Sequence, residues 1–201
     1  MSTFGPIILR RAHHAIEGRL QQAALDLLSG SDLHFRRDGR LDISLVKNHH
    51  IALMFLPAAD IPGYVAEGGA DLGITGRDQV AEYQASLPAT DHTGMGEVLD
   101  LGFGKCKLQV QVPEHGKVSR VEELVGKTIG TSFVALTEQY FARLEGQQEN
   151  TVNGDASNGV KFRTKIKRLS GSVEIACASR RVDGIVDLVG ACHESHGTEC
   201  S

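Results

Sequence analysis

Residues 51–57 read Ile-Ala-Leu-Met-Phe-Leu-Pro, an unbroken apolar run that a proline closes. A short run of this kind, bounded by a turn residue, is typical of a strand buried on both faces. A short helical pattern follows at 61–68, and residues 71–76 (Asp-Leu-Gly-Ile-Thr-Gly) then predict a strand that runs into a glycine turn. The stretch therefore predicts a strand–helix–strand unit, the building block of α/β sheets.

The same alternation continues through the rest of the chain. Further helices are expected at 23–28, 79–86, 121–125, 137–144 and 172–179. Further strands are expected at 41–46, 107–113, 127–130, 162–169 and 184–189. The polar segment 146–159 is expected to be a flexible insertion. Strands that alternate with helices predict an α/β fold with largely parallel pairing.

Composition narrows the function classes. The 201 residues carry a formal net charge of −4, which argues against a duplex nucleic acid as partner, because phosphate-backbone binders carry a basic excess. No apolar run approaches the ~20 residues that a membrane span needs, so no membrane association is expected. The short apolar run at 4–9 precedes Arg10 and Arg11, whereas a secretory signal has its positive charge first. With only 4 cysteines, the chain is expected to be a reduced cytoplasmic protein.

Three junctions between an expected strand and an expected helix are rich in glycine and hydroxyl residues: 73–76, 130–133 and 170–174. Backbone N–H groups at a helix start attract anions, and a glycine lets a phosphate come close. Helix capping explains Thr131 or Ser172 equally well at a single junction. Three such junctions favour an anionic substrate at the carboxyl ends of the strands. Gly73→Val is expected to crowd the approach of this ligand to the backbone, while the fold largely survives.

Carboxylates flank the last expected strand. Asp183 and Asp187, four residues apart, would share one face of it. An acidic residue at the end of an apolar strand is costly to bury alone, so each is expected to be exposed or to hold ribose hydroxyls or a Mg²⁺-bound substrate. Asp71 precedes a similar run, where a solvated turn residue is the alternative.

No metal site held by protein ligands alone is predicted. The adjacent pairs His13-His14 and His49-His50 are poor ligands, since neighbouring side chains diverge. The tail at 192–200 contains cysteine, histidine and glutamate, which zinc accepts, but an unstructured tail is the alternative because the chain offers no scaffold around it.

Six blocks of sequence, in order, resemble the ATP phosphoribosyltransferases, in particular the fungal form. The blocks are residues 56–62, 71–76, 101–108, 131–133, 171–174 and 183–189. The resemblance implies a two-lobed α/β catalytic core like that of periplasmic binding proteins of the second type. It places the second lobe as an insertion at 105–182, with 1–104 and 183–201 forming a discontinuous first lobe. The strand at 184–189 is then expected in the same sheet as 51–56.

The resemblance also implies an activity. Phosphoribose is transferred from phosphoribosyl pyrophosphate to N1 of ATP, giving phosphoribosyl-ATP and pyrophosphate with Mg²⁺ as cofactor, in the first step of L-histidine biosynthesis. Positioning and charge neutralisation should dominate, because N1 is already nucleophilic, so no general acid or base is nominated. The residues expected to bind ATP are Arg19, Asp71, Gly73, Thr75 and Gly76. Those expected to line the phosphoribosyl pyrophosphate site or the cleft are Thr131, Ser132, Gly171, Ser172, Glu174, Asp183 and Asp187. The family's homo-oligomers imply self-association.

The chain departs from the family pattern at three places. Residues 13–17 stand where the family has a proline–lysine element, and Arg180 and Val182 replace small residues. After Val189, residues 190–193 (Gly-Ala-Cys-His) replace the Ser/Thr-Gly-x-Thr loop that wraps the 5′-phosphate. The core is therefore expected to be incomplete at its C-terminus, without the family's regulatory domain. A non-catalytic nucleotide-binding or partner subunit of the same fold is the alternative function, and a transport-type solute-binding protein would require a signal sequence.

We expect the chain as written to react ATP with phosphoribosyl pyrophosphate far more slowly than a full-length relative. Charge-assisted hydrogen bonds contribute ~1.5–3 kcal/mol each, so losing three loop donors costs roughly 4–9 kcal/mol, or about three to six orders of magnitude. Steady-state pyrophosphate release measures the difference against a version in which residues 190–201 are replaced by the family's continuation. Comparable rates would contradict this interpretation.

Overall fold

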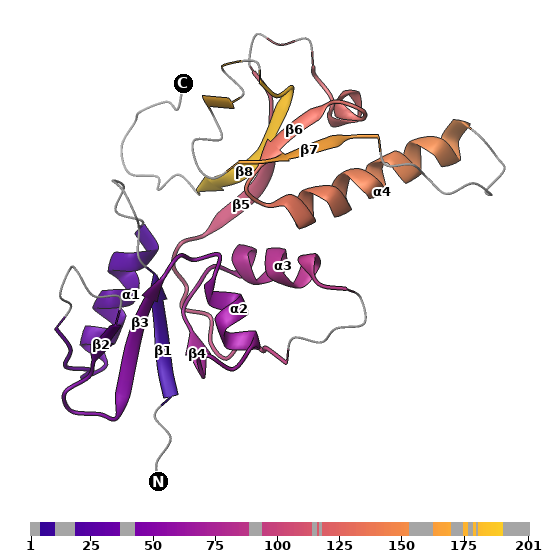
Figure 1. Cartoon of the computed structure of the whole chain (residues 1–201). Helices are drawn as coiled ribbons and strands as arrows, with labels where there is room; N and C mark the ends of the chain where they lie inside the picture. The colour runs from indigo at the N-terminus through magenta and orange to yellow at the C-terminus, as the bar shows by residue number, and fades with distance from the viewer. Residues whose placement is uncertain are drawn as a thin grey trace. The chain divides into compact units, whose positions relative to one another are not determined.

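The computed structural model describes residues 5–10, 19–36, 43–88, 94–113, 116, 118–152, 163–169, 175–176, 179 and 181–190. The chain divides into two compact units, Met1–Gly104 and Lys105–Ser201. Each unit contains a four-stranded sheet with helices packed against it (Figure 1). Among the described strands, the pairs β1–β3, β1–β4, β6–β7 and β6–β8 are parallel, while β2–β3 and β5–β8 are antiparallel. The prediction of an α/β fold with largely parallel pairing is confirmed.

The first sheet has the order β2-β3-β1-β4. Its strands are β1 (Gly5–Arg10), β2 (Ile43–Leu45), β3 (Ile51–Leu56) and β4 (Leu72–Gly73). Strand β1 lies between β3 and β4 and runs parallel to both, so the short apolar run near the N-terminus is a central strand. This role was not predicted from the sequence.

Helices cover both faces of this sheet. They are α1 (Arg19–Gly30) and α2 (Ile61–Ala66), and α3 (Arg77–Ser86) packs against α2. Leu53 and Phe55 of β3 join a buried cluster with residues of α1, whereas Met54 and Leu56 pack with Ile61 at the start of α2. Because neighbouring residues of a strand point to opposite faces, α1 and α2 lie on opposite sides of the sheet (Figure 1). This explains why 51–56 is apolar at every position.

The second sheet has the order β5-β8-β6-β7. Its strands are β5 (Cys106–Gln111), β6 (Thr128–Thr131), β7 (Lys165–Arg168) and β8 (Gly184–Gly190). The expectation that β8 returns to the sheet of β3 is wrong, because β8 pairs antiparallel with β5 and parallel with β6. Its placement in the first lobe is corrected accordingly. Ile185 packs with Val182 on one face of the sheet, and Val186 packs with Ile129 and Phe141 on the other. Because β8 is apolar on both faces, it lies inside the second sheet, between β5 and β6.

One long helix covers a face of the second sheet. Helix α4 (Val134–Val152) packs through Phe141 onto Ile129 and Leu124, the latter from the short 3-10 helix η1 (Val121–Leu124). The expected flexible insertion is wrong for residues 146–152, which continue α4. Glutamine and glutamate are good helix formers, and adding turns to an existing helix needs no new nucleation. Residues 153–159 lie outside the described part.

Two smaller observations complete the fold. Of the helix expected at 172–179, Ile175 and Ala176 are helical, while most of the remaining positions lie outside the described residues. In the ranges that the structure describes, no helix has both the length and the apolar character that a membrane crossing requires.

A buried carboxylate joins α4 to the start of β7. Glu145 is 0% exposed. Its two oxygens accept hydrogen bonds from the backbone N–H groups of Arg163 and Thr164, each at 2.9 Å, and from the Thr164 hydroxyl. The Thr164 hydroxyl also accepts the N–H of Gly126 at 3.0 Å, in the turn before β6. Burial raises the pKa of Glu145, but the hydrogen bonds from Thr164 and Arg163 outweigh it and hold that pKa below its usual value.

We expect Glu145→Gln to lower the free energy of unfolding by about 1–3 kcal/mol at pH 7, because the amide nitrogen replaces one oxygen and presents a donor to the backbone N–H that this oxygen accepted. A lowered folded-state pKa stabilises the fold above the unfolded value of about 4.3, and this contribution is lost as the pH falls through the folded-state pKa. The difference between wild type and Glu145→Gln should therefore shrink below about pH 4. Urea unfolding of wild type and Glu145→Gln at pH 7 and pH 3 measures this difference in the free energy of unfolding.

The matched control is Glu138→Gln, which changes an exposed carboxylate on the same helix. Its effect should stay within about 0.5 kcal/mol at either pH. An equal cost of Glu145→Gln at pH 7 and pH 3 would show that the ionised carboxylate is not what stabilises this junction.

Candidate functional site

The predicted ATP turn lies at the carboxyl ends of strands in the first unit. Strands β3 and β4 are both parallel to β1, so the loop after β3 and the turn 73–76 after β4 emerge at the same edge of the sheet. The Thr75 hydroxyl donates to the carbonyl oxygen of Ala58 at 3.2 Å and joins the two segments. Gly76 is the N-cap of α3. The structure thus brings Thr75 and Gly76 together at a strand-end edge.

Gly73 is required by packing inside the protein. A Cβ atom at this position would lie 2.7 Å from Cγ2 of Ile61 and 3.1 Å from Cγ2 of Val65, both of α2. Valine would therefore force the contact between α2 and β4 to shift, so weaker ligand binding by Gly73→Val would not separate ligand approach from packing. At Gly76 the atom in the way is Oδ1 of Asp78, the end of a flexible side chain that can rotate away. Gly76 is the better position for testing ligand approach to this turn.

Two other residues expected to bind ATP are less closely tied to the turn. Asp71 is exposed and precedes β4, so the two-residue strand separates it from the turn. Arg19 begins α1, and its side chain lies outside the described part. For both residues, ATP binding stays a prediction.

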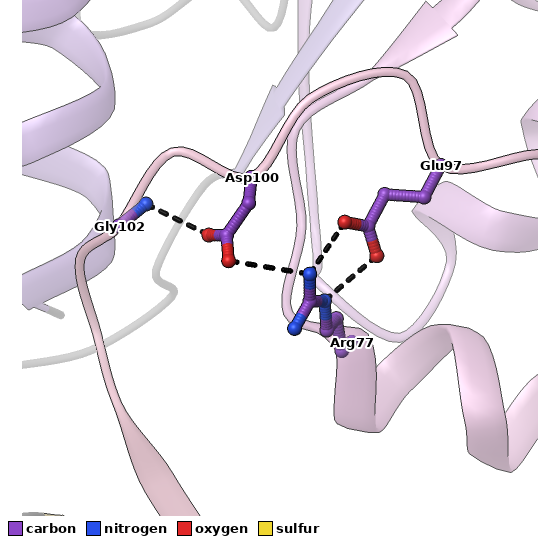
Figure 2. Close-up of polar contacts among 4 residues, drawn as sticks. All are labelled: Arg77, Glu97, Asp100 and Gly102. Carbon is purple, nitrogen blue, oxygen red and sulfur yellow. Dashed lines mark hydrogen bonds and ion pairs between the residues drawn. The ribbon is translucent and has the colours of Figure 1, made fainter.

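An arginine directly after the turn anchors the segment that leads out of the first unit. The Arg77 Nε donates to Glu97 Oε2 at 2.7 Å, while Nη2 donates to the other Glu97 oxygen and to Asp100 Oδ2 at 3.2 Å (Figure 2). The second oxygen of Asp100 accepts the N–H of Gly102 at 2.8 Å. Gly102 has φ +74°, a left-handed conformation that favours glycine. We call these four residues the Arg77 clasp.

The clasp was not predicted from the sequence. Its carboxylates follow Arg77 by 20 and 23 residues, a separation at which no local periodicity relates the positions. The hydrogen bond from Arg77 is the main cause that lowers the pKa of Glu97, and the same bond raises the pKa of Arg77. The pairing with Glu97 is therefore complete at neutral pH and is lost as the pH falls through the lowered pKa of Glu97.

We expect Arg77→Ala to return the pKa of Glu97 upward toward the ordinary glutamate value and to speed amide exchange at Gly102. An NMR titration of side-chain carboxyl groups, with amide exchange on the same sample, measures both. Arg120→Ala is the control, because it removes an exposed ion pair to Glu122 in the second unit. An unchanged Glu97 pKa in Arg77→Ala would contradict the geometry in Figure 2.

In the second unit, three of the predicted residues meet where parallel strands end. Thr131 is the last residue of β6, Ser132 follows it and is exposed, and Asp187 lies in β8 one residue after Val186, the register partner of Thr131. The Asp187 Oδ1 accepts the N–H of Leu188 at 2.8 Å. Thr131 itself is 0% exposed. The carboxylate and the Ser132 position form the accessible part of this edge.

Asp183 lies at the other end of the same strand. Its Oδ2 accepts the N–H of Thr128 at 2.9 Å, and its own N–H donates to the Thr128 carbonyl at 2.8 Å. These bonds hold the start of β8 to the start of β6. The structure therefore separates Asp183 from Asp187 by the length of four strand residues, about 13 Å.

The remaining predicted positions are Gly171, Ser172, Glu174 and the tail at 192–200, all outside the described residues. Within the described ranges, no group of three or more His, Cys, Asp or Glu is arranged to hold a metal ion.

Two α/β units with candidate ligand residues at strand ends define a two-unit α/β protein. The family described as HisG: ATP phosphoribosyltransferase matches residues 57–193, and the chain belongs to this family. It is 50% identical over 173 residues to the ATP phosphoribosyltransferases of Schizosaccharomyces pombe and Saccharomyces cerevisiae. The resemblance seen in the sequence is thereby confirmed.

These matches cover 86% of this chain and 54% and 52% of the two yeast proteins, so the chain spans about half the length of these relatives. A solved chain described as the ATP phosphoribosyl transferase (HisG:HisZ) complex from Thermotoga maritima has a similar fold, with a TM-score of 0.63 and 21% identity. That match covers 93% of this chain and 74% of the other. It supports the two-unit α/β architecture.

Proposed function

We propose that this chain carries out the chemistry of an ATP phosphoribosyltransferase, the transfer of phosphoribose from phosphoribosyl pyrophosphate to N1 of ATP, in the first step of L-histidine biosynthesis. The observation that carries the proposal is the family match over residues 57–193, which contains the strand-end residues of both units. On this proposal ATP binds at the turn 73–76 of the first unit, and phosphoribosyl pyrophosphate binds near Ser132 and Asp187 of the second.

The proposed roles follow from what each edge offers. Thr75 and Gly76 lie where a helix starts after a parallel strand, a position at which backbone N–H groups favour phosphate. Asp187 offers a carboxylate in β8, one residue after the parallel pairing with β6 ends, and a carboxylate there suits ribose hydroxyls or a cation carried by the substrate. Because ATP N1 is already a nucleophile, the protein's part is to align it with the anomeric carbon and to neutralise charge.

Mg²⁺ is proposed to arrive with the substrate. It commonly binds through one or two carboxylates together with substrate phosphates, and Asp187 supplies such a carboxylate. When bound, the ion neutralises the pyrophosphate leaving group. We also propose that the chain associates with copies of itself, on the basis of its family membership.

We expect Asp187→Asn to lower kcat/KM for phosphoribosyl pyrophosphate by about 10- to 100-fold, the cost of one hydrogen bond to a charged group. The dissociation constant of ATP should stay within about twofold, because one lost contact affects only its own ligand. Continuous pyrophosphate release gives the first quantity, and calorimetric ATP titration gives the second. Glu67→Gln, an exposed change at the end of α2, is the control.

Two results would overturn the proposal. One is ATP binding without pyrophosphate release even after residues 190–201 are replaced by the family's continuation, which would favour a non-catalytic nucleotide-binding subunit. The other is an Asp187→Asn variant with wild-type kcat/KM for both substrates, which would overturn the site proposed for phosphoribosyl pyrophosphate but not the reaction.

A further inference from the structure

Thr131 lies where the parallel pairing of β6 with β7 and with β8 ends. It is the last residue of β6, in register with Val186 of β8 and Arg168 of β7. Its carbonyl oxygen accepts the N–H of Leu169, just after β7, at 2.8 Å. Its side chain is 0% exposed, so no atom of the hydroxyl reaches the surface of the unit.

The Thr131 hydroxyl has a single proton, and the structure assigns it. The hydroxyl donates to the carbonyl oxygen of Val186 at 2.8 Å and accepts the N–H of Phe133 at 2.9 Å. The neighbouring Thr137 hydroxyl lies 3.4 Å away and donates to the Phe133 carbonyl one turn earlier on its own helix. Both hydroxyl protons are therefore used inside the protein. A ligand that needed the Thr131 proton would have to break a buried hydrogen bond.

The acceptor of that proton lies one peptide before the candidate site. The Val186 carbonyl belongs to the peptide group that continues into the N–H of Asp187, and this group is planar. Fixing the carbonyl therefore fixes the direction in which the backbone enters Asp187. The Asp187 carboxylate is then held from the other side by the N–H of Leu188.

We infer that Thr131 is a positioning residue for the reaction, which orients Asp187 through the Val186 carbonyl and does not touch the substrate. The inference rests on the proposed function and deepens it. It replaces the expectation that the Thr131 side chain lines the ligand site. The same hydroxyl fixes the first turn before α4 through Phe133, so Ser132, between the two bonded residues, is set by it as well.

The experiment uses Thr131→Val, which keeps the shape and loses the hydroxyl, and Thr131→Ser, which keeps the hydroxyl. Calorimetric titration of the whole chain with phosphoribosyl pyrophosphate and Mg²⁺ should show about fivefold to tenfold weaker binding for Thr131→Val, the equivalent of one neutral hydrogen bond. Thr131→Ser should stay within about twofold of wild type. ATP affinity should not change in either, because the proposed ATP turn belongs to the first unit.

A double-mutant cycle with Asp187→Asn decides whether Thr131 acts through Asp187. In the Asp187→Asn background, Thr131→Val should add less than about a twofold loss, since the group being positioned is already gone. Losses that multiply would overturn the inference, as would equal weakening by Thr131→Val and Thr131→Ser or a parallel loss of ATP affinity. Thermal unfolding confirms that each variant is folded at the temperature of titration.

If the wild-type chain binds no phosphoribosyl pyrophosphate, the proposed function is overturned. The positioning role of Thr131 is then tested by a second measurement that needs no ligand. Amide hydrogen exchange at residues 186–189 should then be faster in Thr131→Val than in wild type and in Thr131→Ser. Unchanged exchange in Thr131→Val would overturn the inference independently.

Discussion

The parallel pairing of β8 with β6 is the interaction on which the second unit depends. It places Ile185 and Val186 against opposite faces of one sheet, where Ile185 packs with Ala176 and Val182, and Val186 packs with Phe141 of α4. It also sets which residues emerge together at the carboxyl ends, because the register brings Thr131 opposite Val186. A shift by one residue would turn Asp187 to the other face and separate the hydroxyl from its carbonyl. The core and the candidate site therefore require the same register.

Most helices and strands can be predicted from local sequence patterns. The arrangement of the strands depends on pairing between distant residues, which local patterns do not show. The unbroken apolar run 51–56 and the alternation at 107–113 predict strands because both are local patterns. The run at 4–9 contains Gly5 and Pro6, and only its pairing with β3 and β4 makes it a central strand. The sheet to which β8 belongs depends on a partner 55 residues away in the chain, at Thr131, so no window of sequence contains it.

In the candidate site too, the sequence gives the type of each residue, while only the structure shows which groups lie beside it. The sequence predicts Gly73 and Thr131 as ligand-binding positions, whereas the structure shows that both are constrained by groups that the sequence does not place beside them. Ile61 and Val65 crowd Gly73, and the Val186 carbonyl takes the Thr131 proton. Asp183 and Asp187 looked equivalent on a strand, yet the backbone N–H of Thr128 engages only the first. The Arg77 clasp joins residues that have no sequence relation at all.

Glu145 has a consequence for how this fold tolerates change in length. Its carboxylate fixes Arg163 and Thr164 from a position in the middle of α4, so the start of β7 does not depend on the chain that connects it to the end of the helix. Doubling the length of a flexible connection costs only about 0.6 kcal/mol of closure entropy when its ends are held. Sequence added between Val152 and Arg163 is therefore expected to leave the hydrogen bonds of Glu145 to Arg163 and Thr164 in place. Related chains with longer or shorter connections here can keep the same second sheet.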